Sequence, residues 1–329
     1  MGTQAMFAAA PTRAGMYESF YLRAVCPDEP VGVWIRYTVR KPPGSVPRGS
    51  LWCTVFDARR GRPFMHKLST DELSVPAGGW IAVGDSAIGP AYAHGDSGQA
   101  RWSLRFACDQ PQLHHLSPEW LYRSPLPRTK LTSPAPAASF DGTVELPGRD
   151  AIELRGWPGM VGHNWGSEHA ERWIWLHAVA FADAPDAWLD VALGRLRLAG
   201  RMTPWVANGA LCLDGQRHRI GGLAARGTRV AESPDGCSLA LAGARGLRLH
   251  ARVDVPAQSA AGWRYADPDG DRSRDAEHDV VNCSVAAVEL TVTPPHGAPR
   301  TLRSEHGGAY ELGMRERDHG VPLAPFADS

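Results

Sequence analysis

The sequence predicts an all-β protein built from short antiparallel strands. Most of the chain consists of runs that alternate aromatic or branched side chains with polar ones, separated by turns rich in Gly, Pro and Asp. The first 110 residues contain no convincing helical stripe of apolar residues. At 329 residues, the chain is long enough for about two domains.

The N-terminal half is expected to begin with a flexible tail at residues 1–15, which are small, polar and interrupted by proline. The strands expected after it cover residues 17–25, 33–40, 51–57, 78–83 and 100–107. This pattern is typical of an antiparallel meander. Together with the proline-rich segment that follows, it predicts an N-terminal domain at residues 16–140.

Residues 109–140 carry six prolines, which predict neither the interior of a sheet nor a long helix. One helical turn is expected at Ser117-Pro118-Glu119, with the serine as the N-cap. The segment is either an interdomain linker or a cover laid across a barrel mouth. Trp120 and Tyr122 favour the cover, because a free linker has no use for aromatic side chains.

The C-terminal domain is expected at residues 141–329. Its expected strands cover residues 142–154, the second half of 156–181, 188–198, 205–213, 217–220, 228–232, 238–242, 247–255, 280–293 and 308–315. The charged loop at 267–279 is interpreted as solvated, because it lacks the acidic twelfth ligand of a calcium loop. Each half thus offers strands at spacings typical of sandwiches or barrels.

Composition excludes several classes of function. The formal charge is zero and no basic module is present, so nucleic-acid binding is not expected. Phosphate-binding glycine loops are absent, and no nucleotide or other cofactor is expected. The chain shows neither a signal peptide nor an apolar run of membrane-spanning length. It is therefore expected to be cytoplasmic, with most of its six cysteines reduced.

The candidate site lies in residues 156–181, GWPGMVGHNWGSEHAERWIWLHAVAF, which combine a polar, glycine-rich turn with an aromatic strand. His163, Glu168 and Glu171 are the candidate acid–base groups, since a buried glutamic acid with a raised pKa can protonate an apolar substrate. The alternative is structural: Glu168 and His169 pair with arginines or backbone. The spacing matches neither HExxH nor HxxEH, so no metal site is expected.

The strand that follows places Trp173, Trp175 and His177 on one face. Indole rings on the inner face of a barrel either fill it or line a ligand cavity, where they stabilise a cationic intermediate. The predicted ligand-binding residues are Asn164, Trp165, His169, Trp173, Trp175 and His177, joined by Trp120, Tyr122 and Arg123 of the covering segment. Those last three either recognise a polar head group or belong to a solvated loop.

The run Gly162-His163-Asn164-Trp165-Gly166 resembles a motif of the lipocalin-like, double-barrel family that includes tocopherol cyclase and carotenoid 1,2-hydratase (hydroxyneurosporene synthase). The segments YESFYLRA, GVWIRYTV and LWCTVFD are similar to the opening of that family, so the resemblance spans about residues 16–315. It implies two packed lipocalin-like antiparallel β-barrels with a hydrophobic cavity. The hydratases carry an acid before the His-Asn-Trp-Gly run, whereas this chain has Gly162.

These observations predict a protein that binds an isoprenoid or lipid in a Trp-lined barrel cavity. As an enzyme, it would catalyse cyclisation, isomerisation or hydration by proton donation without a cofactor. The alternatives are a non-catalytic carrier of the same ligands and a protein–protein interaction module with filled barrels. An acidic group pointing into the cavity distinguishes the enzyme from the carrier.

Overall fold

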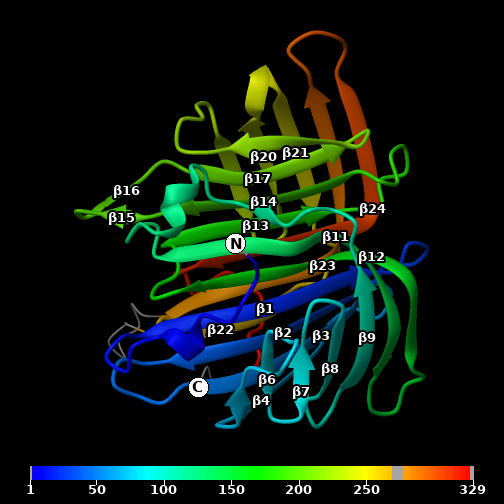
Figure 1. Ribbon diagram of the computed structural model, residues 1–329. Coiled ribbons are helices and arrows are strands. Elements are labelled where there is room, and N and C mark those ends of the chain that lie inside the picture. The colour runs from blue at the N-terminus through cyan, green and yellow to red at the C-terminus, as the bar shows by residue number, and fades with distance from the viewer. Residues whose placement is uncertain (1, 269–276, 327–329) are drawn as a thin grey trace.

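The chain forms two antiparallel β-barrels packed against each other, as Figure 1 shows. The structure, a computed structural model, describes residues 2–268 and 277–326. It confirms the predicted all-β, double-barrel fold. In the figure, the blue and cyan strands of the first barrel lie below the green, yellow and orange strands of the second.

The first barrel is a twelve-stranded sheet in the order β4-β3-β2-β1-β12-β11-β9-β8-β7-β6-β5, with β10 paired to β11. Its strands are β1 (Met16–Val25), β2 (Val31–Lys41), β3 (Arg48–Asp57), β4 (Phe64–Thr70), β5 (Leu73–Ser74), β6 (Ile81–Val83), β7 (Ser86–Ile88), β8 (Tyr92–Asp96), β9 (Arg101–Ala107), β10 (Leu113–His114), β11 (Thr129–Glu145) and β12 (Ile152–Gly166). Two 3-10 helices, η1 (Phe7–Ala9) and η2 (Glu119–Tyr122), flank them. The sheet curls until Val83 of β6 lies over Gly49 of β3, so the barrel is nearly closed.

The second barrel is a ten-stranded sheet in the order β18-β17-β14-β13-β24-β23-β21-β20-β19, with β22 paired to β23. Its strands are β13 (Arg172–Ala178), β14 (Trp188–Arg195), β17 (Val206–Leu213), β18 (Gln216–Gly221), β19 (Arg229–Ser233), β20 (Gly236–Ala242), β21 (Arg248–Asp254), β22 (Ala261–Ala266), β23 (Glu277–Thr293) and β24 (Arg300–Met314). The hairpin of β15 (Arg197–Leu198) and β16 (Arg201–Met202) and the 3-10 helix η3 (Ala244–Gly246) complete it. A bridge between Ile220 and Gly243 brings β18 to the end of β20.

Strand β1 is buried along its whole length because it serves both barrels. Phe20 and Leu22 belong to the apolar core of the first barrel. On the opposite face, Tyr21 packs against Trp175 of β13, and Val25 joins the core shared with the second barrel. Alternate side chains of one strand therefore point into the first barrel and toward the second.

The buried Arg23 of β1 ties the barrels together. Its guanidinium donates to the carbonyl oxygens of Ser284 and Gly307 at 2.9 and 3.0 Å, and to Nδ1 of His177 at 3.2 Å. The Nε2 atom of His177 donates to the carbonyl of Pro136 at 3.0 Å. His177 is therefore held as the neutral tautomer. Burial, and next the charge of Arg23, lower its pKa to about 4.

Strand β11 corrects the expectation that the proline-rich segment cannot enter a sheet. Pro134 and Pro136 lie within β11, where its register with β12 shifts between Thr132 and Ala138. The pairing of β11 with β9 covers only residues 139–145, so the missing N–H groups of Pro134 and Pro136 cost no hydrogen bond to β9. Register shifts of this kind accommodate residues that cannot donate a ladder hydrogen bond.

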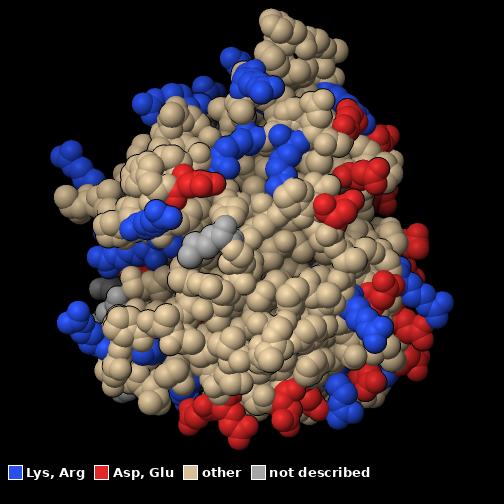
Figure 2. Space-filling view, viewed as in Figure 1, with Lys and Arg blue, Asp and Glu red and all other residues tan. Residues whose placement is uncertain are grey.

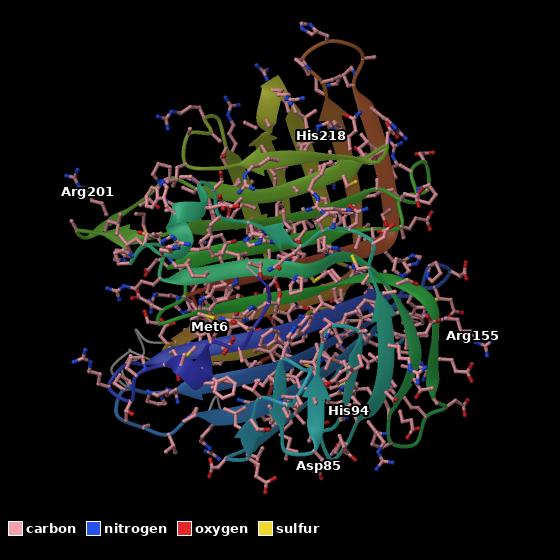
Figure 3. All side chains as sticks on the ribbon, viewed as in Figure 1. Met6, Asp85, His94, Arg155, Arg201 and His218 are labelled. Atoms are coloured by element: carbon pink, nitrogen blue, oxygen red, sulfur yellow. The ribbon has the colours of Figure 1, made fainter. Side chains whose placement is uncertain are left out.

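The N-terminal residues, which were expected as a flexible tail, make hydrogen bonds to β1 and β2. The carboxylate of Glu18 accepts hydrogen bonds from the backbone N–H groups of Met6 and Phe7, at distances of 2.8–3.0 Å. Lys41 donates to the carbonyl oxygens of residues 11, 12 and 14. Figure 3 shows Met6 lying beside β1.

The boundary between the barrels differs from the expected division at residues 140 and 141. Strand β12, which was assigned to the C-terminal domain, pairs with β1 and β11 of the first sheet. The chain crosses to the second barrel only between β12 and β13. The proline-rich segment was thus mistaken for a boundary, although the strand after it returns to the first sheet.

Two smaller expectations concern the charged loop and the cysteines. Residues 269–276 of the loop lie outside the described residues, but Asp267 at its start is buried, not solvated. All six cysteines are free, since the described residues contain no disulfide. No helix in the described ranges has the length and apolar character needed to cross a membrane.

We expect His177 to make stability fall at acidic pH. The unfolded chain binds a proton at His177 below about pH 6.5, whereas the folded chain binds it only near pH 4. Stability is therefore complete above pH 6.5 and is lost as the pH falls toward 4. Urea unfolding at about pH 7 and about pH 5 measures the drop in the free energy of unfolding between the two pH values. In His177→Gln this drop should be about 2 kcal/mol smaller than in wild type.

The matched control is His94→Gln, because His94 is exposed on β8. It should leave the difference between the two pH values unchanged. An equal pH dependence in wild type and His177→Gln would contradict the assignment.

Candidate functional site

A cavity of about 580 Å³ lies between the two barrels. The residues of the first barrel that line it are Tyr17, Tyr21, Trp34, Arg36, Thr129, Leu131 and Asn164. Those of the second barrel are Trp173, Ile174, Trp175, Ala192, Leu193, Gly194, Val206, Asn208, Tyr265 and Glu311. The loops, η2 and the β15–β16 hairpin add Leu116, Trp120, Leu121, Ser124, Leu126, Pro127, His169, Ala170, Leu196, Leu198, Thr203 and Leu223. The lining is mostly apolar and aromatic, and the volume is in the range of small-molecule sites.

Strand register explains the wall formed by the second barrel. Glu311, Trp175, Ala192 and Asn208 are direct neighbours across β24, β13, β14 and β17, so their side chains share one face. That face is the outer surface of the second barrel. The opposite face of β13, with Ile174 and Leu176, belongs to the main apolar core. The tryptophans of β13 therefore face the neighbouring barrel, not the barrel interior that the sequence predicted.

Glu311 is the acidic side chain in this cavity. Its Oε1 atom accepts a hydrogen bond from Nε1 of Trp173 at 2.9 Å, and Oε2 accepts one from Nδ2 of Asn282 at 3.2 Å. Both partners are donors, so each carboxylate oxygen accepts one hydrogen bond. Glu311 is partly buried and sits in the same row as Trp175, which presents an apolar ring beside it.

Arg36 supplies a positive charge to the same cavity. Its side chain is 7% exposed, and its Nε atom donates to Oγ of Ser19 at 3.0 Å. The guanidinium carbon lies 4.5 Å from the centre of the Tyr265 ring. Nη1 has no hydrogen-bond partner among the described residues. A buried, unpaired N–H of this kind is a ready donor for a carbonyl or anionic oxygen of a ligand.

Two further polar atoms at the wall lack partners. The Oδ1 atoms of Asn164 and Asn208 are buried and accept no hydrogen bond from the described residues. Asn164 comes from β12 and Asn208 from β17, so the two barrels each contribute one amide. Unsatisfied buried acceptors are rare, and at a cavity wall they indicate where a ligand hydroxyl would bind.

His169 forms a partly buried pair with Asp267 at one edge of the cavity. The Nδ1 atom of His169 lies 2.6 Å from Oδ1 of Asp267, and its backbone N–H donates to the same oxygen at 2.8 Å. Burial raises the pKa of Asp267, but the bonds from His169 outweigh it and give a net lowering. The ring of His169 stacks on Tyr17 at 4.1 Å. His278 completes the cluster, with its Nδ1 atom 3.9 Å from Oδ2 of Asp267.

The segment before β11 covers the cavity. Tyr122 of η2 donates to the carbonyl of Leu131 at 2.6 Å and accepts from the N–H of Leu116 at 3.2 Å. His115 lies 3.0 Å from Oγ of Ser133 and 3.3 Å from the buried carboxylate of Asp190 on β14. The segment is thus anchored to both barrels, in agreement with the cover alternative.

Apolar side chains surround the mouth of the cavity. Trp120 is 59% exposed, Leu198 45% and Leu223 51%. Leu198 belongs to the β15–β16 hairpin, from whose tip Arg201 projects away from the body in Figure 3. On the face shown in Figure 2, charged side chains gather toward the periphery and leave the middle largely uncharged.

The structure brings together five of the twelve predicted site residues. Asn164, His169, Trp173, Trp175 and Trp120 line the cavity, whereas Trp165, His177, Tyr122 and Arg123 do not. Trp165 stacks on His163 at 4.6 Å, outside the cavity. His177 is engaged with Arg23, and Tyr122 holds the cover.

The three predicted acid–base residues also lie away from the cavity wall. Glu168 forms an ion pair with Arg128. Glu171 lies 2.7 Å from Arg197 and 3.0 Å from Arg315. These arginine pairs correspond to the structural alternative. The Nε2 atom of His163 lies 2.7 Å from the buried Glu18, which turns it toward the first barrel.

Tyr21 explains why the chain has glycine where the hydratases carry an acid. Tyr21 and Gly162 are direct neighbours across β1 and β12, and the phenol ring lies over the glycine. Any side chain at position 162 would collide with that ring. Burial, and next the charges of Asp190 and Glu311, raise the pKa of Tyr21, so it stays a neutral phenol.

Several cavity residues escaped the sequence analysis. Tyr17, Tyr21, Trp34 and Arg36 lie in two runs that were recognised as strands, but alternation alone does not show that the second face is also buried. Glu311 was not predicted because it lies between two apolar residues in the last strand, GAYELGMR, far from the motif. A charged residue inside such a run was the signal available for it.

Comparisons with known proteins are consistent with this fold. The chain is similar over 96% of its length to a putative AttH of Nitrosomonas europaea (12% identity, 97% of that chain, TM-score 0.54). Kievitone hydratase of Nectria haematococca matches 95% of the chain (8% identity, 96% of that chain, TM-score 0.50). CghA, in a structure with Sch210972, matches 91% (12% identity, 88% of that chain, TM-score 0.59). Such identities show a shared fold.

Among curated sequences, two uncharacterized proteins from strains of Mycobacterium tuberculosis are 26% identical over 167 residues, 50% of this chain and 50% of each relative. The chain thus spans about half the length of the curated relatives it matches. No protein-family model matches the sequence.

We expect Gly162→Asp to destabilise the fold by about 1–3 kcal/mol, because the new side chain meets the Tyr21 ring in a closely packed joint. In a Tyr21→Ala background, Gly162→Asp should cost less than it does in wild type. Chemical denaturation of the two single variants and the double variant measures the effect. As a control, Gly194→Ala on β14 should be nearly neutral, since its added carbon would meet only Ala170 at 3.5 Å. A single variant as stable as wild type would contradict the collision.

Proposed function

We propose that the chain binds an apolar small molecule of isoprenoid, lipid or polyketide type between the barrels and catalyses proton transfer on it. Cyclisation, isomerisation and hydration are the reactions that such transfer supports. The observation that carries the proposal is the Glu311 carboxylate within a tryptophan-lined cavity that also holds the unpaired N–H of Arg36. Neither group depends on a cofactor for this role.

Glu311 is suited to accept a proton first and to return it later. Its carboxylate oxygens accept hydrogen bonds from Trp173 and Asn282, and as a carboxylate it would act first as a general base toward a substrate C–H or O–H, or toward a water. Once protonated, the same carboxyl group donates the proton to another substrate atom. This sequence replaces the direct proton donation that was inferred for Glu168 and Glu171.

Arg36 and the indole rings stabilise the charge that this transfer creates. The Nη1 group of Arg36 would donate to a carbonyl or enolate oxygen, which polarises the adjoining carbon atoms. The faces of Trp173 and Trp175 would stabilise a substrate carbon that becomes electron-poor. Asn164 and Asn208 would orient hydroxyl groups of the ligand.

The neighbouring structures support this class of function. One of them is a hydratase by name, and another is a complex with the compound Sch210972. The resemblance of the His163-Asn164-Trp165-Gly166 run to tocopherol cyclase and carotenoid 1,2-hydratase adds isoprenoids to the candidate ligands. Six unpaired cysteines suit the reducing cytoplasm, which we propose as the location.

A carrier of the same ligands is the second candidate. Both carboxylate oxygens of Glu311 already accept a hydrogen bond, which is also the arrangement of a structural acid. In that case, the cavity and its cover would bind a ligand without changing it. Turnover separates the two functions, and binding is common to both.

Ligand binding should depend on the space between the barrels. Ala192 lies in the middle of the cavity wall, so Ala192→Trp fills the cavity and should abolish binding. Native mass spectrometry of wild type with added isoprenoids and fatty acids should show a bound molecule that this variant lacks. Ala231→Trp, on the exposed face of β19, is the matched control and should bind normally. Equal binding by Ala192→Trp and wild type would place the ligand elsewhere.

Catalysis should depend on Glu311. We expect Glu311→Gln to retain ligand but to lower proton transfer about 10²–10⁴-fold, since the amide accepts no proton. The measurement is incorporation of deuterium from D₂O into the bound molecule, followed by mass spectrometry. Glu168→Gln keeps the cavity intact and should exchange at the wild-type rate. Binding without exchange in wild type would favour the carrier, and full exchange in Glu311→Gln would exclude Glu311 as the base.

A further inference from the structure

We propose that His169, Asp267 and His278 form a binding site for a divalent transition-metal ion at the edge of the cavity. The inference does not rest on the proposed proton transfer, in which these residues take no part. It concerns a donor set different from the His163, Glu168 and His169 that the sequence had suggested and for which no metal was expected.

The three side chains converge from separate parts of the second half of the chain. His169 precedes β13, Asp267 follows β22, and His278 lies near the start of β23. One potential ligand atom from each lies within 4.8 Å of the other two. Ligands around a tetrahedral ion with bonds of about 2.1 Å are about 3.4 Å apart, so side-chain movements of about 1 Å would close the set.

His278 provides the independent observation. Its side chain is fully buried, yet neither Nδ1 nor Nε2 has a hydrogen-bond partner among the described residues. An imidazole with both nitrogens unsatisfied is costly in a protein interior. An ion bound between His278 and Asp267 would satisfy one of them, and the carboxylate is already directed at Nδ1 from 3.9 Å.

The surroundings favour a fixed geometry. The backbone N–H of His169 holds Oδ1 of Asp267, which leaves Oδ2 toward His278. Aromatic rings enclose the set: Tyr17 stacks on His169 at 4.1 Å, and Trp173 lies 5.1 Å from His278. Outer contacts of this kind orient metal ligands and exclude water.

The arginines near His278 are already paired with carboxylates. Arg315 lies close to His278 but pairs with Glu171 at 3.0 Å. Arg317 pairs with Asp279 and lies 3.3 Å from Glu277. These two arginines therefore leave the Asp267 carboxylate available as the anionic ligand of the set.

Two imidazoles and one carboxylate suit first-row divalent ions such as Zn²⁺, Co²⁺ and Fe²⁺. Three protein ligands leave at least one coordination position for another group. Because His169 also lines the cavity, that position would lie near the bound small molecule. There the ion would bind a carbonyl or hydroxyl oxygen.

The test uses the full-length protein after treatment with chelator and dialysis. Titration with Co²⁺, followed by its visible absorption, and with Zn²⁺ by calorimetry should show one ion per chain. His278→Ala and the isosteric Asp267→Asn should each weaken binding at least 10-fold. His250→Ala, an exposed histidine on β21, is the matched control and should bind as wild type does.

Circular dichroism of each variant checks folding, and Asp267→Asn decides the question if His278→Ala does not fold. Zn²⁺ should also raise the melting temperature of wild type and of His250→Ala but not of Asp267→Asn. The proposal is overturned if wild type binds no ion, or if Asp267→Asn binds as tightly as wild type. Neither outcome affects the proton-transfer role of Glu311, which the deuterium experiment tests separately.

Discussion

The joint between the barrels depends on β1, a strand with no free face. Its alternation of apolar and polar residues would ordinarily indicate one buried face and one solvated face. Instead, Phe20 and Leu22 fill the first barrel, while Tyr21 and Arg23 are buried against the second. Arg23 can lie there because its guanidinium finds carbonyl oxygens and a neutral imidazole across the joint. Burying this cation is possible only where the second barrel provides those acceptors.

The cavity lies at the same interface between the barrels. Two convex barrel surfaces cannot touch everywhere, and space remains where Tyr21, Trp175 and Trp34 keep the strands apart. Three polar side chains stand among the mostly apolar and aromatic residues that line this space: Arg36 on β2, Asn164 on β12 and Glu311 on β24. Each belongs to a strand that is rigidly paired on both sides. These polar groups are thus held by the two sheets, while the segment before β11 covers the cavity and lines it with side chains such as Trp120 and Leu121.

The fold was largely accessible from the sequence, because strand alternation and turn residues are local signals. The candidate site was accessible in part. Trp173 and Trp175 were correctly expected to share a face, but which surface that face meets depends on how two barrels pack. Glu168 and Glu171 stood out by their place in the motif, and the arginines that engage them come from distant segments. Glu311 lies about 150 residues from the motif, and only the pairing of β13 with β24 places it beside Trp175. Such long-range pairing leaves no local trace.

Because the cavity is walled mainly by the outer faces of strands, most of its lining is separate from the residues that fill either barrel. Ala192 and Asn208 can change in size or polarity while Val191 and Ala207 of the core behind them stay the same. Mutation can therefore remodel the cavity with little effect on the two interiors. An architecture of this kind lets a lineage acquire new chemistry while its scaffold remains intact.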